Sequence, residues 1–484
     1  MGHSSLVGTI GGLILTGAST TMIGAEVLDD QHWVHSGAHA PASAAVGGHF
    51  GTDVDSSGGM VIIGAPYQGT DPFHPAGPGY AQLGRLHGSE RATTTLSAPD
   101  GVDGDLFGLR VLLQPNLTDP AQSPIAMITA PRRSSDSGDA LSGAVYNFHP
   151  DQSGGASWQQ TITPADASAG QMFGVSMDFD GKTLAIGAPR DSTYASVGGT
   201  VYLYMIDENG MAVNEQRLDP RIPIDQQFFG FSVDIDGDRL AVGAFADSSY
   251  ADLGGAVHIF DRQHDGSWLQ TARIAPQEVL EWDYFGTAIA LQGDVLIASS
   301  NDRRVNGLPS VGRVYVFHKI GEEWVQVQSI DPPRVTPSVY WGVSLCLRDD
   351  LLAIGANGWT NNDMTTGAAS VLRVDGDGVW RFVQTLLADG VGDGGAFGTC
   401  VALAEESLLI GAPDFTAEGN DTLHAYAVTC LGDLTGDHES TIVDMIEVIS
   451  SWDATGISVA DLTQDFEVGI PDLLVATGYW GACP

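Results

Sequence analysis

Short apolar runs separated by turn residues recur along most of the chain, and they predict β-strands. Three such runs follow one another at 175–179, 183–188 and 200–204. Asp-Gly pairs between the first two runs, at Asp180 and Asp236, predict tight hairpins. A fourth run opens with tryptophan at Trp158, Trp268, Trp324 and Trp380. Each unit therefore predicts four short antiparallel strands.

The unit repeats with a nearly constant period. An aromatic residue followed by glycine begins each copy, at Phe50, Phe107, Phe173, Phe229, Phe285, Trp341 and Phe397. From Phe173 onward these anchors are evenly spaced, and only the second unit, which carries an insertion, is clearly longer. Rungs of a β-solenoid are usually shorter, and tandem sandwiches would not keep this period. A four-stranded repeat of this length predicts a mainly β fold, a seven-bladed β-propeller.

The two ends of the repeat region predict how the ring closes. The seventh unit, 397–428, lacks a tryptophan strand, whereas the N-terminal segment contains one at Trp33. Trp33 precedes Phe50 by the same separation as Trp268 precedes Phe285. The segment at about 28–48 is therefore expected to complete the last blade, because closure removes exposed sheet edges. The propeller is expected to span 28–429.

The aromatic-Gly anchors and the Gly-Ala-Pro segments, as at 187–189, resemble the FG-GAP repeats of integrin α-chain propellers and their bacterial relatives. In that family many blades hold calcium in a DxDxDG loop between the first two strands. The corresponding hairpins here are too short for a full oxygen cage. Four aspartates in them are therefore expected to be turn and solvated residues: Asp178, Asp180, Asp234 and Asp236.

The charge and the N-terminus suggest an exported protein. The net charge is −40 with only two lysines, which excludes a general nucleic-acid binder. Residues 1–25 resemble a secretory signal peptide, although no Lys or Arg precedes the apolar run; a misassigned start or a disordered tail is the alternative. This run is too short to span a membrane. The expected location is extracellular or at the cell surface.

One face of the ring is the expected ligand-binding surface. The loops between strands 2 and 3 and between strands 4 and 1 emerge together, and such loops commonly hold functional residues. Arginine and aromatic residues, which are enriched at binding hot spots, occur there and give five candidates: Trp359, Arg132, Arg133, Arg303 and Arg304. Tyr194 and Tyr250 lie one repeat period apart and are expected to pack against the next blade instead.

The C-terminal segment 430–484 changes pattern. Two copies align, Asp433 with Asp461 and Trp452 with Trp480, each with acidic and hydroxyl residues at the spacings of an EF-hand loop before an apolar stretch. This resembles the dockerin module, which in its family binds calcium and docks onto a cohesin partner. The resemblance implies these calcium ligands: Asp433, Thr435, Asp437, Glu439, Thr441 and Asp444 in the first loop, and Asp461, Thr463, Asp465, Glu467 and Asp472 in the second.

The tail also departs from the dockerin pattern. His438 and Phe466 stand where the loop usually has glycine. A degenerate pair held together by its apolar helices is therefore the alternative to a working calcium module. Cys430 and Cys483 bracket the segment, and a disulfide between them fits an exported protein. Cys346 and Cys400 are expected to be buried free thiols.

The sequence contains no GxSxG, Walker or HExxH motif, and its histidines lack metal-ligand spacing. We therefore expect a non-enzymatic binding or adhesion protein whose propeller face takes a protein or glycan ligand and whose tail docks or anchors it. One alternative is a dockerin-tethered component of extracellular polysaccharide breakdown. Another is a structural envelope protein with a sorting tail.

Overall fold

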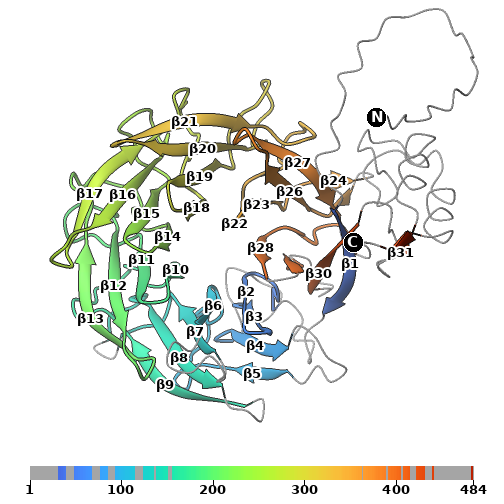
Figure 1. Cartoon of the computed structure of the whole chain (residues 1–484). Helices are drawn as coiled ribbons and strands as arrows, with labels where there is room; N and C mark the ends of the chain where they lie inside the picture. Colours follow the sequence, from blue (N-terminus) through green and yellow to red (C-terminus); the bar gives the residue numbers. More distant parts are fainter. Residues whose placement is uncertain are drawn as a thin grey trace, which may run out of the picture.

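Seven four-stranded antiparallel sheets are arranged in a ring in the computed structural model (Figure 1), which confirms the predicted seven-bladed propeller. The structure describes residues 31–39, 48–67, 77–85, 93–114, 124–135, 138–150, 155–361, 364–387, 391–404, 407–414, 421–430, 439–440 and 481–482. No helix in these ranges is long and apolar enough to cross a membrane.

The first strand of each blade lies nearest the centre of the ring, and the second strand lies beside it (Figure 1). The first strands are β2 (Val54–Ser57), β6 (Val111–Gln114), β10 (Ser176–Phe179), β14 (Ser232–Asp236), β18 (Ile289–Gln292), β22 (Leu345–Arg348) and β28 (Cys400–Leu403). The second strands are β3 (Met60–Ala65), β7 (Ile125–Ala130), β11 (Thr183–Ala188), β15 (Arg239–Ala244), β19 (Val295–Ser300), β23 (Leu351–Ala356) and β29 (Ser407–Ala412).

The third and fourth strands complete each blade outward. The third strands are β4 (Tyr80–Arg85), β8 (Ala144–Pro150), β12 (Thr200–Ile206), β16 (Ala256–Arg262), β20 (Arg313–Ile320), β26 (Ala368–Val374) and β30 (Thr422–Cys430). The fourth strands are β5 (Thr94–Leu96), β9 (Ala156–Ile162), β13 (Ala212–Leu218), β17 (Trp268–Ile274), β21 (Glu323–Ile330), β27 (Trp380–Leu386) and β1 (Gln31–His39). A small hairpin, β24 (Thr360–Asn361) and β25 (Met364–Thr365), lies in the loop between β23 and β26.

The N-terminal strand closes the ring as the sequence predicts. β1 pairs antiparallel with β30, placing Trp33 opposite Val428, and so serves as the fourth strand of the seventh blade. The predicted tight hairpins are also present: β14 and β15 pair Asp236 with Arg239 around Gly237, whose φ is 60°. A left-handed backbone of this kind favours glycine at that position.

The aromatic anchors hold neighbouring blades together. All seven anchor side chains are fully buried, and several of their backbones form parallel bridges to the preceding blade, as between Gly143 and Phe173. Phe173 also packs edge-to-face on Tyr202, with ring centroids 5.5 Å apart. Close backbone approach explains the Gly-Ala pair, because a Cβ added to Gly187 would overlap the carbonyl oxygen of Gly230 in the next blade.

A hydroxyl or thiol on the first strands adds a second fastening between blades. The Ser176 hydroxyl donates to the Gly230 carbonyl at 2.8 Å, and equivalent serines do the same in two other blades. At the closing junction Cys400 takes this role, since its Sγ donates to the Gly51 carbonyl at 3.2 Å. Cys346 and Cys400 are free thiols as expected, although Cys346 is only half-buried.

Candidate ligand-binding face

Several predicted binding residues occupy one recurring position in the loops between strands 2 and 3. Asp191, Asp247, Arg303 and Trp359 each lie at the same distance after their blade's aromatic anchor, and Arg133 is the equivalent after the insertion in the second blade. In each of these blades the backbone carbonyl of this residue accepts a hydrogen bond from the glycine before the third strand, as Asp191 does from Gly199 at 2.9 Å. The position is therefore a structural element of the repeat.

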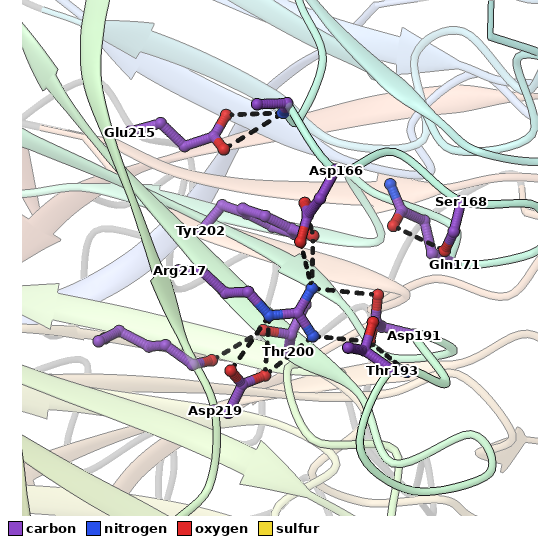
Figure 2. A network of polar contacts seen from close by, with 12 residues as sticks. Asp166, Ser168, Gln171, Asp191, Thr193, Thr200, Tyr202, Glu215, Arg217 and Asp219 are labelled. Atoms are coloured by element: carbon purple, nitrogen blue, oxygen red, sulfur yellow. Dashed lines mark hydrogen bonds and ion pairs between the residues drawn. The ribbon is translucent and has the colours of Figure 1, made fainter. Parts of the chain in front are cut away.

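In the third blade this position is Asp191, which belongs to an ionic network centred on Arg217 (Figure 2). Arg217, from the fourth strand β13, donates to Asp191 at 2.7 Å, to Asp166 at 2.7 Å and to Asp219 at 3.0 Å. Burial works against ionisation of Asp166, but hydrogen bonds from Tyr202 and Arg217 lower the pKa of Asp166 overall. The network joins the loops on both sides of the blade.

In the second and fifth blades the charges are reversed. Arg133 is buried and donates to Asp100 at 2.5 Å, and Arg303 is buried and contacts Asp283. Burial raises the pKa of Asp283 despite this contact. Both guanidinium groups, which the sequence suggests as ligand contacts, thus pair with an aspartate of the preceding interblade loop. These two arginine side chains have a structural role.

Trp359 is also buried, with 1% of its surface exposed, so its side chain has no surface for a ligand in this structure. Of the five predicted ligand-binding residues, Arg132 is half-buried and Arg304 is exposed. Arg304 donates to the Gly307 carbonyl of its own loop at 3.2 Å. The structure therefore does not bring the five residues together as one surface.

The two period-matched tyrosines differ from expectation. Tyr194 and Tyr250 are 66% and 50% exposed, and each ring lies beneath an arginine of the outer strand of its own blade. The guanidinium carbon of Arg273 is 5.6 Å from the Tyr250 ring centroid, and the tyrosine hydroxyl donates to the Arg273 carbonyl at 2.9 Å. Packing against the next blade was the wrong expectation, because a cation–π contact within the blade holds each ring.

An aromatic cluster lies at the junction of the fourth and fifth blades. It consists of Phe228, Phe231, Phe245, Trp282 and Tyr284, which are joined by ring contacts. Centroid distances are 5.0 Å from Phe228 to Phe245, 4.6 Å from Phe231 to Phe245 and 5.8 Å from Phe245 to Tyr284. Trp282 is 55% exposed and the other four are half-buried. We call this set the aromatic cluster.

The backbone of Trp282 is unusual for so large a residue. It has a φ of 67°, three residues before the anchor Phe285. At the same offset the second, third and seventh blades have Gly104, Gly170 and Gly394, all with positive φ. A left-handed backbone costs a non-glycine residue roughly 1–2 kcal/mol, so tryptophan here opposes local stability while remaining largely exposed.

The residue directly before each anchor is also left-handed, and never glycine. The seven residues are His49, Leu106, Met172, Phe228, Tyr284, Tyr340 and Ala396, with φ between 41° and 61°. Aromatic side chains fill this position in three consecutive blades. Sequence analysis did not select them, although their regular recurrence was visible beside the anchors.

The carboxylates of the first strands bind the next blade rather than solvent. Asp178 accepts a hydrogen bond from the Ile235 backbone at 2.7 Å, and Asp234 accepts one from Leu291 at 3.0 Å. The two carboxyls also hydrogen-bond to each other. Asp55 accepts from Leu113 at 2.7 Å in the same manner. The expectation of solvated residues is therefore wrong for Asp178 and Asp234, because they satisfy backbone donors of the neighbouring strand.

These carboxyls have raised pKa values. Burial raises the pKa of Asp55 to about 7. Burial and the neighbouring Asp178 raise the pKa of Asp234 well above its ordinary value, and burial raises that of Asp178. Asp180 does match its prediction, since it accepts bonds from Lys182 and Thr183 in the turn. Asp236 accepts from Gly293 of the next blade at 2.6 Å.

The metal and disulfide predictions for the tail fall almost entirely outside the described residues. Beyond β30 only a short pair is described, β31 (Glu439–Ser440) with β32 (Gly481–Ala482). The other predicted calcium ligands and Cys483 lie outside, so calcium binding and the Cys430–Cys483 bridge stay predictions. Within the described ranges, no group of three or more His, Cys, Asp or Glu side chains could hold a metal ion.

Comparison with known proteins identifies the repeats. Residues 157–204, 225–260 and 268–317 match the FG-GAP repeat. These segments run from the fourth strand of the second blade to the third strand of the fifth, and they include the loops of the aromatic cluster. The chain therefore contains FG-GAP repeats within its propeller, as the anchor motifs predicted. No curated protein matches the sequence.

Proposed function

We propose that this protein is a secreted or cell-surface, non-enzymatic binding or adhesion protein, and that the aromatic cluster is the centre of its ligand-binding face. The fold supports this proposal because a closed propeller with FG-GAP repeats holds its loops on a rigid scaffold. The ligand is a protein or a glycan. Both classes are bound through exposed aromatic rings, which supply a large apolar area at a small entropic cost.

The left-handed Trp282 is the observation that supports this assignment most directly. Strained backbone positions persist where something other than stability retains them. Burial does not explain the tryptophan, because 55% of its surface is exposed. Glycine fills the equivalent position in three other blades and would avoid the strain. A role in ligand contact accounts for a large, exposed and locally unfavourable side chain.

The C-terminal segment adds an attachment function to this proposal. Its two loops with acidic residues at EF-hand spacings resemble a dockerin module, and we propose that they bind calcium and dock the propeller onto a cohesin-like or other surface partner. The support is the sequence pattern alone, with Asp at the first, fifth and twelfth positions of both loops.

A Trp282→Gly variant tests the ligand-binding proposal. The wild-type and variant chains would be measured by surface plasmon resonance against immobilised extracellular-matrix proteins and polysaccharides. Binding of any ligand should weaken by about 10-fold or more, the usual loss at an aromatic hot spot. Thermal stability should be unchanged or higher, because glycine relieves the backbone strain.

Gln226→Gly is the matched control. Gln226 occupies the same position in the fourth blade, also with a positive φ of 61°. This substitution should relieve the strain in the same way and leave binding unchanged. Wild-type affinity in the Trp282→Gly chain would contradict the proposed face, and so would equal losses in both variants.

A further inference from the structure

A groove on the rim of the ring lies between the fourth and fifth blades, separate from the aromatic cluster. It has a volume of about 510 Å³ and lies between the outer strands β17 and β21. Its lining includes Tyr250, Arg273, Gln277, Phe317, Glu323 and Trp324. This volume is within the range of small-molecule sites, roughly 300–1,000 Å³.

Two aromatic rings in the groove are held in place by the protein itself. Tyr250 is fixed by its hydrogen bond to the Arg273 carbonyl and by the guanidinium over its ring. Trp324 is fixed by Arg239, whose guanidinium carbon is 5.3 Å from the indole centroid. Arg239 in turn donates to Asp261 at 2.9 Å and to Asp294 at 2.8 Å. A ligand that packs on these rings therefore meets preorganised surfaces.

Polar groups with free hydrogen-bonding capacity surround these rings. Within the described part of the chain, the Arg273 guanidinium makes only a 3.7 Å ion pair with Asp247 and the stacking on Tyr250. The Gln277 side chain is exposed and can both donate and accept. Glu322 and Glu323, which also line the groove, are exposed acceptors.

This combination of a cationic group, an amide and two carboxylates favours one class of ligand. The two glutamates oppose a simple anion, and Arg273 opposes a simple cation. A neutral ligand with many hydroxyl groups can use both the donors and the acceptors of the groove, because each hydroxyl donates and accepts. Its C–H faces can pack on the Tyr250 and Trp324 rings. We propose that the groove between β17 and β21 is a saccharide-binding site, a second site that does not depend on the proposed ligand-binding face.

Titration of the full chain with oligosaccharides tests this inference. The probes are short cello-, xylo-, manno- and chito-oligosaccharides, with saturation-transfer NMR to detect contact and calorimetry to measure affinity. At least one probe should bind with a Kd of about 1 mM or tighter, which corresponds to roughly −4 kcal/mol. Tyr250→Ala and Trp324→Ala should each weaken that binding by about 10-fold or more.

Tyr194→Ala is the matched control, since Tyr194 occupies the same position one blade earlier and also lies beneath an arginine, Arg217. It should leave affinity unchanged. Because Trp324 contacts the core, its variant is checked by thermal unfolding. If it fails to fold, Gln277→Ala replaces it, an exposed substitution that should also weaken binding.

The remaining outcomes separate the two sites. Absence of binding by every probe would overturn the saccharide inference, and so would an equal loss in Tyr194→Ala. Binding that disappears in Trp282→Gly but persists in Tyr250→Ala would also overturn it, while supporting the aromatic cluster as the ligand face. Binding lost in Tyr250→Ala and retained in Trp282→Gly would support the groove independently of the cluster.

Discussion

Asp234 and Asp178 form a carboxyl pair at the centre of the ring, and replacing Asp234 by asparagine should stabilise the protein at high pH. Both carboxyls have raised pKa values and hydrogen-bond to each other, so the pair shares a proton, and we expect it on Asp234, whose pKa is raised well above its ordinary value. Asp234 also accepts a hydrogen bond from the Leu291 backbone. Asparagine reproduces both bonds, because its Nδ2 donates and its Oδ1 accepts. The Asp234→Asn variant therefore keeps the contacts and removes one titrating group.

The sign of the pH dependence follows from linkage. The folded-state pKa of Asp234 is raised, so the folded protein retains a proton that the unfolded chain releases at its ordinary pKa of about 4. Wild-type stability must therefore fall as pH rises from about 4 toward the raised pKa. Above that value it stays at the lower level. The variant lacks this fall, so the two stabilities should be equal near pH 4 and diverge as pH increases.

The size of the effect comes from the repulsion between the two charges. Two unit charges about 4 Å apart interact by roughly 4 kcal/mol at an effective dielectric constant of about 20. Asp178 and Asp234 are only half-buried, so partial screening by water reduces this figure. We expect Asp234→Asn to be more stable than wild type by about 2–4 kcal/mol at pH 9.

Urea unfolding followed by fluorescence between pH 4 and pH 9 measures this difference. Asp178→Asn is the matched control. The Asp178 carboxylate accepts bonds from the Ile235 and Phe179 backbones and from Asp234, whereas an amide has a single acceptor oxygen. Near pH 4 this control should therefore lose stability by about 1–3 kcal/mol, whereas Asp234→Asn should not. Part of this loss should be recovered toward pH 9, because Asp178→Asn also removes the repulsion. A constant difference between Asp234→Asn and wild type across this range would refute the shared-proton reasoning.

Other predictions concern blade packing, buried ion pairs and the tail. Gly187→Ala should cost roughly 1–3 kcal/mol or prevent folding, because its Cβ meets a carbonyl of the next blade. Thermal unfolding measures this against Gly376→Ala, where an added Cβ meets nothing within 4 Å and the backbone is not left-handed. Arg303→Ala should destabilise by about 3–5 kcal/mol at neutral pH, since it leaves Asp283 buried without its cation, and less at acidic pH; unchanged stability would contradict the pairing. Asp433→Ala combined with Asp461→Ala should abolish calcium binding by the full chain in calorimetry, and calcium binding that survives both substitutions would place the ion elsewhere.

The seven-bladed ring could be predicted from the sequence, because each repeat indicates both its own strands and the residues that contact the neighbouring blade. The constant period fixes the strand order, and the anchors that define the period are the side chains buried between blades. Ring closure was also predictable, because Trp33 stands at the same distance before Phe50 as Trp268, Trp324 and Trp380 do before their anchors. In both cases one sequence position has the same structural role wherever it recurs in the ring.

The binding face was harder to predict, because equivalent loop positions carry different residue types in different blades. Arg133 and Arg303 resembled hot-spot residues in isolation. Their role becomes visible only when they are aligned with Asp191 and Asp247, where the arginine comes from the fourth strand instead. Because arginine and aspartate swap positions between blades, a search for one residue type at one position does not find such a pair. Spatial proximity is needed to recognise it.

Repetition itself gives a criterion for separating function from fold in this protein. A residue whose equivalents make the same contact in every blade is explained by blade packing, as the loop carbonyls at Asp191 and Trp359 are. Trp282 is different, because its equivalents in three blades are glycines that suit the same backbone better. Tyr250 shares its arginine contact with Tyr194, yet it lines the rim groove. Trp282 is therefore a candidate because its repeat position does not require it, and Tyr250 is a candidate because of the groove that it lines. Both lie where the fourth blade meets the fifth.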